Sequence, residues 1–247
     1  MGISYSDLYG QVQGDRAVAV RQMLKYVELL PTQPQGEVLD FGCGWGFMLE
    51  ALQQRGWPCL GVEISEGQAA AARSFGLPVE HVHDSIAWLR EQVGSGRRWA
   101  AIFLIDVIEH IAAPQQIELA GLLFQALIPG GHLVLRNPNP DSLVGLRMMF
   151  GDYTHRFTPT ADALQGLLKA SGFSSVTTRD ELSWIEPWSQ VWWRYFPYPR
   201  ALLKEAFYRL GRPMLRAWRR LLIASELGLE TASRLPLAPN YLCIAIR

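Results

Sequence analysis

The chain has 247 residues, with 23 basic and 23 acidic residues and a formal charge of zero. A neutral chain has no overall field that attracts nucleic acid, so a nucleic-acid partner is not expected. Hydrophobic residues make up 49% of the sequence, enough to bury the core of one large domain with or without an appendage.

The cysteines and the lack of targeting signals indicate the cellular compartment. The three cysteines, Cys43, Cys59 and Cys243, show no CxxC spacing, which favours reduced thiols over a disulfide framework or zinc site. The first sixteen residues lack the basic and apolar regions of a signal peptide, and no apolar run approaches about 18 residues. We therefore expect a cytoplasmic protein, either a monomer or a homodimer, without a metal.

In chain order, residues 15–30 show helical spacing of apolar residues and end at a Pro-rich break. Strand-like runs and helix-like segments then alternate. The strands are expected at 37–41, 59–64, 79–83, 99–106 and 131–138, and the helices at 46–55, 66–75, 85–92 and 114–127. This alternation predicts an α/β fold with a doubly wound, mostly parallel sheet.

The C-terminal part adds a helix over 158–173, with Thr160 as N-cap, and strands over 173–182 and 240–247. About 55 residues between these strands are aromatic and then basic. We expect three parts: an N-terminal helical segment, 1–35, that covers a ligand site; a main domain, 36–184 plus 239–247; and a helical insertion, 185–238.

The stretch "EVLDFGCGWGF" is the most informative motif, because a strand ends in glycine-rich backbone that leads into a helix. Glycines at 42, 44 and 46 allow positive φ and leave main-chain N–H groups open to a ligand. A dinucleotide-binding turn and a tight structural turn would share these glycines.

Two acids sharpen the interpretation. Asp40 lies where a pyrophosphate would be repelled and a cationic amino or sulfonium group attracted. Glu63 ends the next strand, where an acid can accept both hydroxyls of an adenosine ribose.

The order of Asp40-Phe-Gly-Cys-Gly-Trp-Gly, Glu63, Asp84-Ser85, "FLIDVIEHI" and "LIPGGHLVL" resembles class I S-adenosylmethionine-dependent methyltransferases over 37–183. The resemblance implies a seven-stranded sheet completed at 240–246, with S-adenosylmethionine as cofactor and S-adenosylhomocysteine as product. Under it, Glu63 and the adjoining Ile64 bind the ribose, and Asp84 reaches the adenine amino group. The remaining implied cofactor residues are Asp40, Gly42, Cys43, Gly44 and Gly46 around the methionine, Ser85 and Ile86 beside the adenine, Asp106 near the methionine amino group or reacting methyl, and Tyr9 from the N-terminal segment.

A closer resemblance is to small-molecule methyltransferases, through Glu109-His110 and the motif from Asp152 to Pro159. Similar proteins modify quinone precursors, glycans, lipids and other metabolites. We expect methyl transfer to a small or lipid-linked acceptor, most readily at oxygen. Two alternatives stay open: a non-catalytic cofactor-binding module of the same fold, and an NAD-dependent oxidoreductase. The acceptor is expected near Arg136, Asn137, Tyr153 and Trp184.

His155 is the first candidate for the base, because an imidazole that is neutral near pH 7 can take the acceptor's proton. Asp106 and His110 are further catalytic candidates, although His110 and His155 could equally be structural hydrogen-bonders. His81 and His83 alternate on one expected strand, but no third metal ligand is evident beside them.

The insertion needs its own interpretation. Residues 194–220 carry eight basic residues against Glu205 alone, and four tryptophans fall between 184 and 193. A helical wheel from residue 200 separates an apolar face from arginines at 209, 212, 216, 219 and 220. The segment 194–224 therefore fits contact with an anionic membrane, placing the protein at the inner face of a membrane. A lid over the acceptor pocket and a dimer contact are the alternatives.

Overall fold

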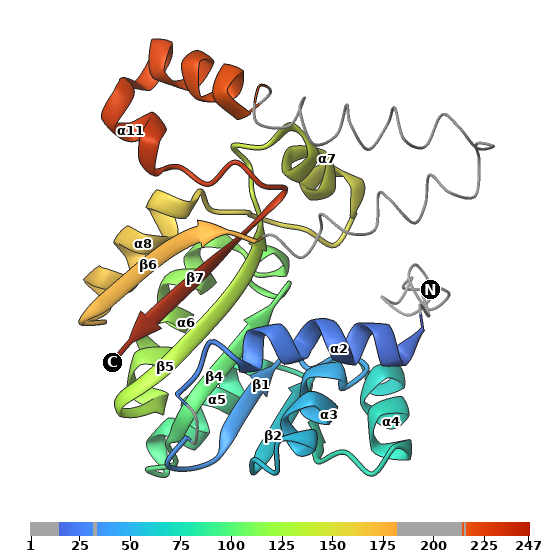
Figure 1. Cartoon of the computed structure of the whole chain (residues 1–247). Helices are drawn as coiled ribbons and strands as arrows, with labels where there is room; N and C mark the ends of the chain where they lie inside the picture. Colours follow the sequence, from blue (N-terminus) through green and yellow to red (C-terminus); the bar gives the residue numbers. More distant parts are fainter. Residues whose placement is uncertain (1–14, 32–33, 182–213, 215) are drawn as a thin grey trace, which may run out of the picture.

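The computed structural model describes residues 15–31, 34–181, 214 and 216–247. Its centre is a seven-stranded sheet in the order β3-β2-β1-β4-β5-β7-β6 (Figure 1). The strands are β1 Val38–Phe41, β2 Cys59–Glu63, β3 Val79–His81, β4 Trp99–Ile105, β5 Leu127–Pro138, β6 Ser175–Asp180 and β7 Asn240–Ile246. Only β7 runs antiparallel to its neighbours β5 and β6, so the predicted doubly wound, mostly parallel sheet is confirmed.

Helices cover both faces of this sheet (Figure 1). They are α2 Arg16–Val27, α3 Phe47–Gln54, α4 Glu66–Ser74, α5 Ser85–Gly94, α6 Ala113–Ala126, α7 Leu143–Gly151, α8 Ala161–Ala170 and α11 Leu229–Arg234, with a 3₁₀ turn η1 at Ile108–His110. Residues 216–227 are also helical. One buried cluster joins the sheet to α5, α6 and α8, and the other joins it to α2, α3 and α4.

The packing follows the sequence pattern. Strands β1 and β4 are buried along nearly their whole length, because helices lie over both of their faces. Their adjacency brings Asp40 opposite Phe103 and places the chain after β1 beside the chain after β4. The carboxyl ends of the parallel strands consequently form one edge, where ligand sites of open α/β sheets lie.

One local prediction is confirmed, and other local features were not predicted. Thr160 caps α8, its hydroxyl accepting the N–H of Ala163, as expected. The Pro-Gly-Gly turn is a bulge inside β5, since the register with β4 jumps from Leu127 to His132. Helix α7 and η1 were not predicted.

Candidate active site

The glycine loop after β1 presents bare main chain at Gly44. Its φ is 51°, and a Cβ built there would meet only the Oε1 atom of Gln68, at 3.7 Å. The N–H of Gly44 donates to Oε2 of Glu63 at 2.8 Å. The loop thus leaves room above Gly44 and fixes an acid beside it.

Three residues near Gly44 serve the framework of the loop, which refines the sequence prediction. Gly46 begins α3 with φ 76°, and a Cβ there would lie 2.5 Å from Cδ1 of Leu77, so glycine is required by packing. The Cys43 side chain is buried in the core, and the N–H groups of Gly42 and Cys43 both donate to the Val62 carbonyl, so these two are not open to a ligand as the sequence predicted. Gly42 is similarly tight, because a Cβ would meet Val107.

Glu63 and Asp40 are both buried carboxyl groups beside this loop. Oε1 of Glu63 accepts the N–H of Ser65 at 2.7 Å, so both of its carboxylate oxygens are held by main chain. Burial and, secondarily, the charge of Glu63 raise the pKa of Asp40 to about 8. Asp40 is therefore largely protonated near pH 7 until a cation compensates its charge. Ile64, by contrast, is exposed.

Asp84 follows β3 and caps helix α5. Its Oδ1 accepts the N–H groups of Ile86 and Ala87 at 2.9 and 3.0 Å. Because β3, β2 and β1 are adjacent, Asp84 after β3, Glu63 at the end of β2 and Asp40 near the end of β1 lie at one edge of the sheet. Ser85 begins α5, and the Ile86 side chain is buried in the core.

Arg16, at the start of α2, is a candidate binding residue that sequence reasoning missed. Its guanidinium pairs with Glu50, donates to the Trp45 carbonyl and lies 3.8 Å from the Phe75 ring centroid. Its buried Nη2 has no hydrogen-bond partner among the residues that the structure describes. Nothing in the sequence around Arg16 indicated a binding residue, because its approach to the glycine loop depends on tertiary packing.

Asp106, after β4, has φ 55°, a conformation that non-glycine residues rarely adopt outside functional sites. Arg136 on β5 forms an ion pair with Asp106 and donates to the Tyr26 hydroxyl of α2 at 2.8 Å. The predicted Asp106 and Arg136 thus meet, and through Tyr26 they join helix α2 to this edge. Helix α2 is therefore tied to this edge of the sheet, while the expected covering role of 1–35 stays a prediction.

A pocket of about 510 Å³ opens next to Asp106. Helix α7, which the sequence did not reveal, forms one wall. The pocket is lined by Asp106, Glu109, His110, Pro138, Val144, Arg147, Met148, Gly151, Asp152 and His155. It therefore collects all three predicted catalytic residues, Asp106, His110 and His155.

The two histidines pack edge to face, with ring centroids 4.7 Å apart. Nδ1 of His155 donates to the Met149 carbonyl at 3.1 Å, and its Nε2 lies 3.8 Å from Oδ2 of Asp152. Nδ1 of His110 lies 2.9 Å from the Thr154 hydroxyl. Burial and the neighbouring His155 lower the pKa of His110.

Glu109 completes this cluster. One carboxylate oxygen of Glu109 and one ring nitrogen of each histidine all lie within 4.8 Å of one another. Burial, and then the charge of Asp106, raise the pKa of Glu109 well above its usual range. Its Oε2 is buried without a hydrogen-bond partner within the described part of the chain.

The remaining predicted substrate residues do not lie together in the pocket. Asn137 is fully buried, and its amide donates to the Pro138 carbonyl and the Tyr241 hydroxyl, so it belongs to the framework rather than to the pocket. The Tyr153 side chain is 95% exposed, in the loop between the pocket-lining residues Asp152 and His155. Tyr9 and Trp184 lie outside the described residues.

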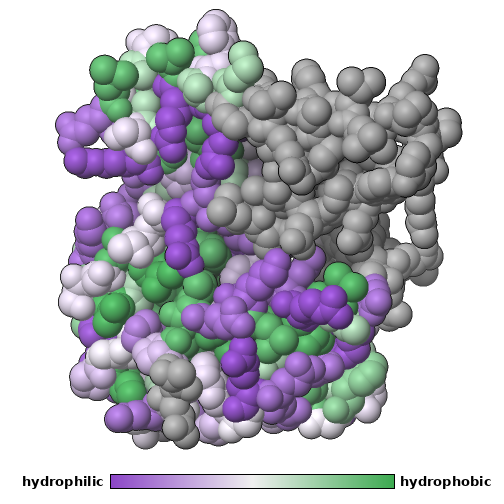
Figure 2. All heavy atoms as spheres, in the orientation of Figure 1, coloured by the Kyte–Doolittle hydropathy of each residue, from purple (hydrophilic) through white to green (hydrophobic). Residues whose placement is uncertain are grey.

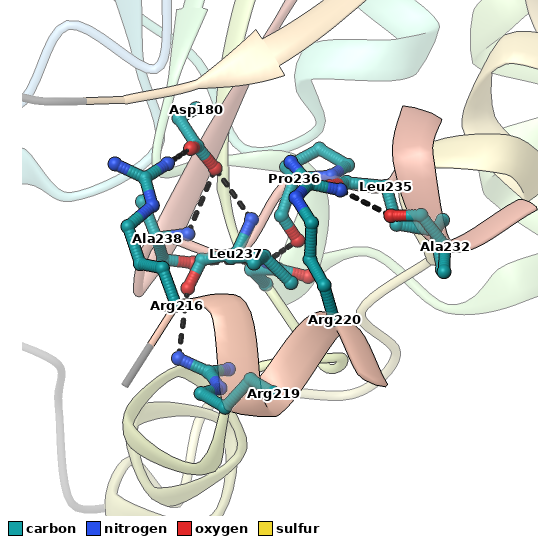
Figure 3. Close-up of polar contacts among 10 residues, drawn as sticks. Asp180, Arg216, Arg219, Arg220, Ala232, Leu235, Pro236, Leu237 and Ala238 are labelled. Carbon is teal, nitrogen blue, oxygen red and sulfur yellow. Dashed lines mark hydrogen bonds and ion pairs between the residues drawn. The ribbon is translucent and has the colours of Figure 1, made fainter. Parts of the chain in front are cut away.

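The described end of the insertion corrects one expectation about its basic face. Arg216 pairs with Asp180, Arg219 donates to the carbonyls of Leu237 and Asp141, and Arg220 donates to that of Ala232 (Figure 3). These three arginines bind the protein's own acceptors because the chain before β7 folds back beside helix 216–227. They are not a free basic surface.

The opposite side of this helix is apolar. Trp218, Leu221 and Leu222 are half or more exposed. Figure 2 shows hydrophobic residues interspersed with polar ones at the top of the molecule, where this helix lies. Among the described helices, none is long and apolar enough to cross a membrane. Residues 194–213 lie outside the described part.

Comparison with known proteins identifies the family. A family model described as a methyltransferase domain matches residues 13–178, which is more than half of the chain. The match spans α2, the glycine loop, the acids after β2 and β3, and the histidine pocket.

Individual relatives are distant. The chain is similar to a ubiquinone biosynthesis O-methyltransferase of Dinoroseobacter shibae, with 27% identity over 63% of this chain and 66% of that protein. It is also similar to a trans-aconitate 2-methyltransferase of Sinorhizobium fredii, with 30% identity over 53% and 48%. The chain thus spans less than two thirds of these curated relatives. A solved methyltransferase from Archaeoglobus fulgidus shares the fold, with a TM-score of 0.68, 21% identity, and coverage of 99% and 100%.

Proposed function

The chain belongs to the class I S-adenosylmethionine-dependent methyltransferases, and from this premise we propose that it methylates a small-molecule or lipid-linked acceptor, most readily at oxygen. The single observation that carries the proposal is the juxtaposition of two sites at one sheet edge. The glycine loop with Glu63 follows β1 and β2, and the histidine pocket opens at Asp106, after the adjacent β4.

S-adenosylmethionine fits the first site by charge and shape. The open main chain at Gly44 admits the methionine part, and Glu63 retains lone pairs for the ribose hydroxyls. The buried Nη2 of Arg16 supplies a donor for the methionine carboxylate. Asp40 supplies a negative charge once the ammonium or sulfonium group is bound, and Asp84 accepts from the adenine amino group.

The acceptor lies in the histidine pocket with its oxygen directed at the methyl group. Bound S-adenosylmethionine would supply an activated methyl group, which the acceptor oxygen would take in line, with the carbon–sulfur bond broken and its electron pair left on sulfur as S-adenosylhomocysteine. The acceptor's proton passes to Nε2 of His155. Orientation supplies much of the rate, because the sulfonium group is already an activated leaving group. Asp152 stabilises the imidazolium that forms, through its Oδ2 at 3.8 Å.

The apolar surface of helix 216–227 favours an amphipathic acceptor or its carrier surface. Because Arg216, Arg219 and Arg220 bind internal partners, contact with a lipid surface would depend on Trp218, Leu221 and Leu222. The expectation of an anionic surface rests on the arginines of 194–212. A lid over the pocket and a dimer contact remain the competing roles for 185–238.

Transfer of a labelled methyl group to candidate acceptors tests the proposal. We expect turnover of methyl-labelled S-adenosylmethionine with extracts or purified phenols and hydroxylated lipids. His155→Ala should slow the transfer at least tenfold while the affinity for S-adenosylhomocysteine stays within about twofold. Arg90→Ala, at an exposed ion pair, is the matched surface control. Tight cofactor binding without transfer to any acceptor would instead support the non-catalytic module.

The lipid-surface role is tested by vesicle flotation. Trp218→Ser with Leu222→Ser should reduce recovery of the protein with both neutral and anionic vesicles. If recovery from anionic vesicles alone survives, the basic segment carries the contact. Negligible recovery of the unaltered protein with either vesicle would leave the lid or the dimer contact.

A further inference from the structure

Helix α7 turns one face toward the histidine pocket, and the spacing of its residues identifies that face. The helix contributes Val144, Arg147, Met148 and Gly151 to the pocket lining. These positions follow the spacing i, i+3, i+4 and i+7, which places all four on one side of an α-helix. Arg147 therefore lies in the middle of the wall that α7 forms.

Arg147 is the one charged residue of α7, since every other residue of the helix is apolar or glycine. Its side chain is exposed, and it forms no ion pair or hydrogen bond with any residue that the structure describes. The other arginine at this edge, Arg136, is held by Asp106 and the Tyr26 hydroxyl. Arg147 thus brings to the pocket a positive charge that the described part of the chain does not pair.

The acids of the pocket are engaged elsewhere. Asp106 forms the ion pair with Arg136. Asp152 accepts the Thr154 hydroxyl on Oδ1, and its Oδ2 lies 3.8 Å from Nε2 of His155. Burial, and then the charge of Asp106, raise the pKa of Glu109 well above its usual range, which weakens its tendency to ionise. The acids therefore leave Arg147 open to an anion from outside the protein.

We propose that Arg147 is a specificity-determining residue that binds a carboxylate of the methyl acceptor, while the acceptor's hydroxyl lies at the imidazoles. This inference rests on the proposed function and names its acceptor class, a hydroxylated organic acid. The planar guanidinium matches a carboxylate and can donate two parallel hydrogen bonds to it. A doubly charged phosphate fits less well, because Asp106 and Asp152 line the same pocket and would repel the second charge.

The rest of the lining indicates the body of the acceptor. Pro138, Val144 and Met148 supply apolar surface in the same pocket as Arg147 and His155. A volume of about 510 Å³ is enough for a substituted ring. The acceptor therefore has an apolar or aromatic body that joins a hydroxyl to a carboxylate.

Probes matched in shape separate the effect of charge. Protocatechuate, a benzoate with two adjacent hydroxyls, differs from its amide in charge and hardly in size; the corresponding phenylphosphonate can carry a second charge. Calorimetry with the full chain, loaded with S-adenosylhomocysteine, measures the affinity for each. We expect protocatechuate to bind about tenfold more tightly than the amide, and the phosphonate to bind more weakly than protocatechuate.

Variants assign this preference to Arg147. Arg147→Gln should abolish it, and Arg147→Lys should keep part of it, because lysine retains the charge without the planar fork. The side chain is exposed, so both variants should fold. Arg156→Gln is the matched control, since Arg156 is exposed in the loop after α7 and does not line the pocket. It should leave the preference unchanged.

Three binding results would overturn the proposal. They are equal affinity of the unaltered protein for acid and amide, no binding of either probe, and a preference for the acid that survives Arg147→Gln. Tighter binding of the phosphonate than of protocatechuate would overturn the assignment to a carboxylate.

Turnover separates this inference from the function on which it rests. We expect the labelled product formed in extracts to bind an anion exchanger, and Arg147→Gln to raise the KM for that acceptor about tenfold or more, with kcat within about threefold. Charge-dependent probe binding without any methyl transfer would refute the proposed function and leave the carboxylate site standing. Transfer to an uncharged acceptor, or an unchanged KM in Arg147→Gln, would refute the role of Arg147 alone.

Discussion

Asp40 is the residue whose charge the fold controls most strongly for ligand binding. Burial and Glu63 raise its pKa to about 8, so the ligand-free protein keeps it protonated near neutrality. A cationic ligand group beside it favours ionisation. We therefore propose that a cation is selected by a buried acid that releases its proton when the ligand arrives, and not by a standing negative charge.

Asp40→Asn tests this coupling through stability. Between the usual aspartate pKa and about 8, the folded state holds a proton that the unfolded state has released, so stability falls as pH rises, by up to about 1.4 kcal/mol per pH unit. We expect Asp40→Asn to flatten part of this slope between pH 5 and 8, measured by urea unfolding without ligand. Glu109 contributes a residual slope of the same sign. An identical slope in both proteins would contradict the assignment.

Glu63→Gln tests the ribose contact. Loss of the carboxylate should weaken S-adenosylhomocysteine binding by about 1–3 kcal/mol, because buried hydroxyls would lose a charged acceptor. Glu66→Gln makes the same chemical change at an exposed position three residues later and should bind normally. If calorimetry gave equal affinities for the two variants, the ribose would not be bound by Glu63.

Arg16→Gln tests the assignment of the methionine carboxylate. We expect weaker binding of S-adenosylhomocysteine by roughly tenfold, but unchanged binding of 5′-methylthioadenosine, which lacks the amino-acid part. Arg21→Gln on the exposed side of the same helix is the control. Equal losses for both ligands would show that Arg16 supports the fold, through Glu50 and the Trp45 carbonyl, and not the carboxylate.

Helices and strands with a clear periodicity of apolar residues could be predicted from the sequence. Elements whose position depends on tertiary contacts could not. The strands from β1 to β4 and their helices follow from apolar runs, glycines and caps. Helix α7 was not predicted because its sequence, "LVGLRMMFG", follows two Asn-Pro pairs, which favour a loop. Its Gly145 packs against the main chain at Asn139 and Pro239. That contact closes a wall of the pocket and cannot be read from local pattern.

The segment before β7 shows the same limit for charges. A helical wheel placed Arg216, Arg219 and Arg220 on an outer face, yet they bind acceptors on the chain that folds back (Figure 3). The acceptors are main-chain carbonyls and Asp180, which no periodicity links to the arginines. A basic face therefore indicates solvent contact only where no other segment of the chain folds over it.

Asp180→Ala tests how this segment is held. Oδ1 of Asp180 accepts the N–H groups of Leu237 and Ala238, and its other oxygen pairs with Arg216. Removing it should destabilise the protein by about 2–4 kcal/mol, since two main-chain donors lose their acceptor. Glu230→Ala breaks the exposed pair with Arg234 and should cost at most about 0.5 kcal/mol. Comparable losses in urea unfolding would contradict this account.

At the scale of the whole molecule, the parallel order of β3, β2, β1 and β4 gathers the residues that sequence spacing predicted. Asp40 lies near the end of β1, Glu63 ends β2, and Asp84 and Asp106 follow β3 and β4; these four strands lie next to one another. This convergence follows from the alternation of strands and helices, so the cofactor site could be predicted. The acceptor pocket could be predicted only as a cluster of motifs, because its wall α7 depends on tertiary packing. Arg16, beside the glycine loop, was missed for the same reason.

The same topology explains why the glycine-loop site and the histidine pocket lie next to each other. The buried acids beside Gly44 suit a cationic adenosine derivative, and the imidazole pair beside Asp106 suits the loss of a proton from an acceptor. Adjacent strands β1 and β4 set the separation of these groups, and the main chain at Gly42 packs directly against Val107 after β4.

Calorimetric titration of the full chain with S-adenosylhomocysteine, and in parallel with NAD⁺, tests the central assignment most directly. The account predicts saturable one-to-one binding of S-adenosylhomocysteine, weakened in Glu63→Gln, and no binding of NAD⁺ at the same concentrations. Saturable NAD⁺ binding without any heat from S-adenosylhomocysteine would contradict it.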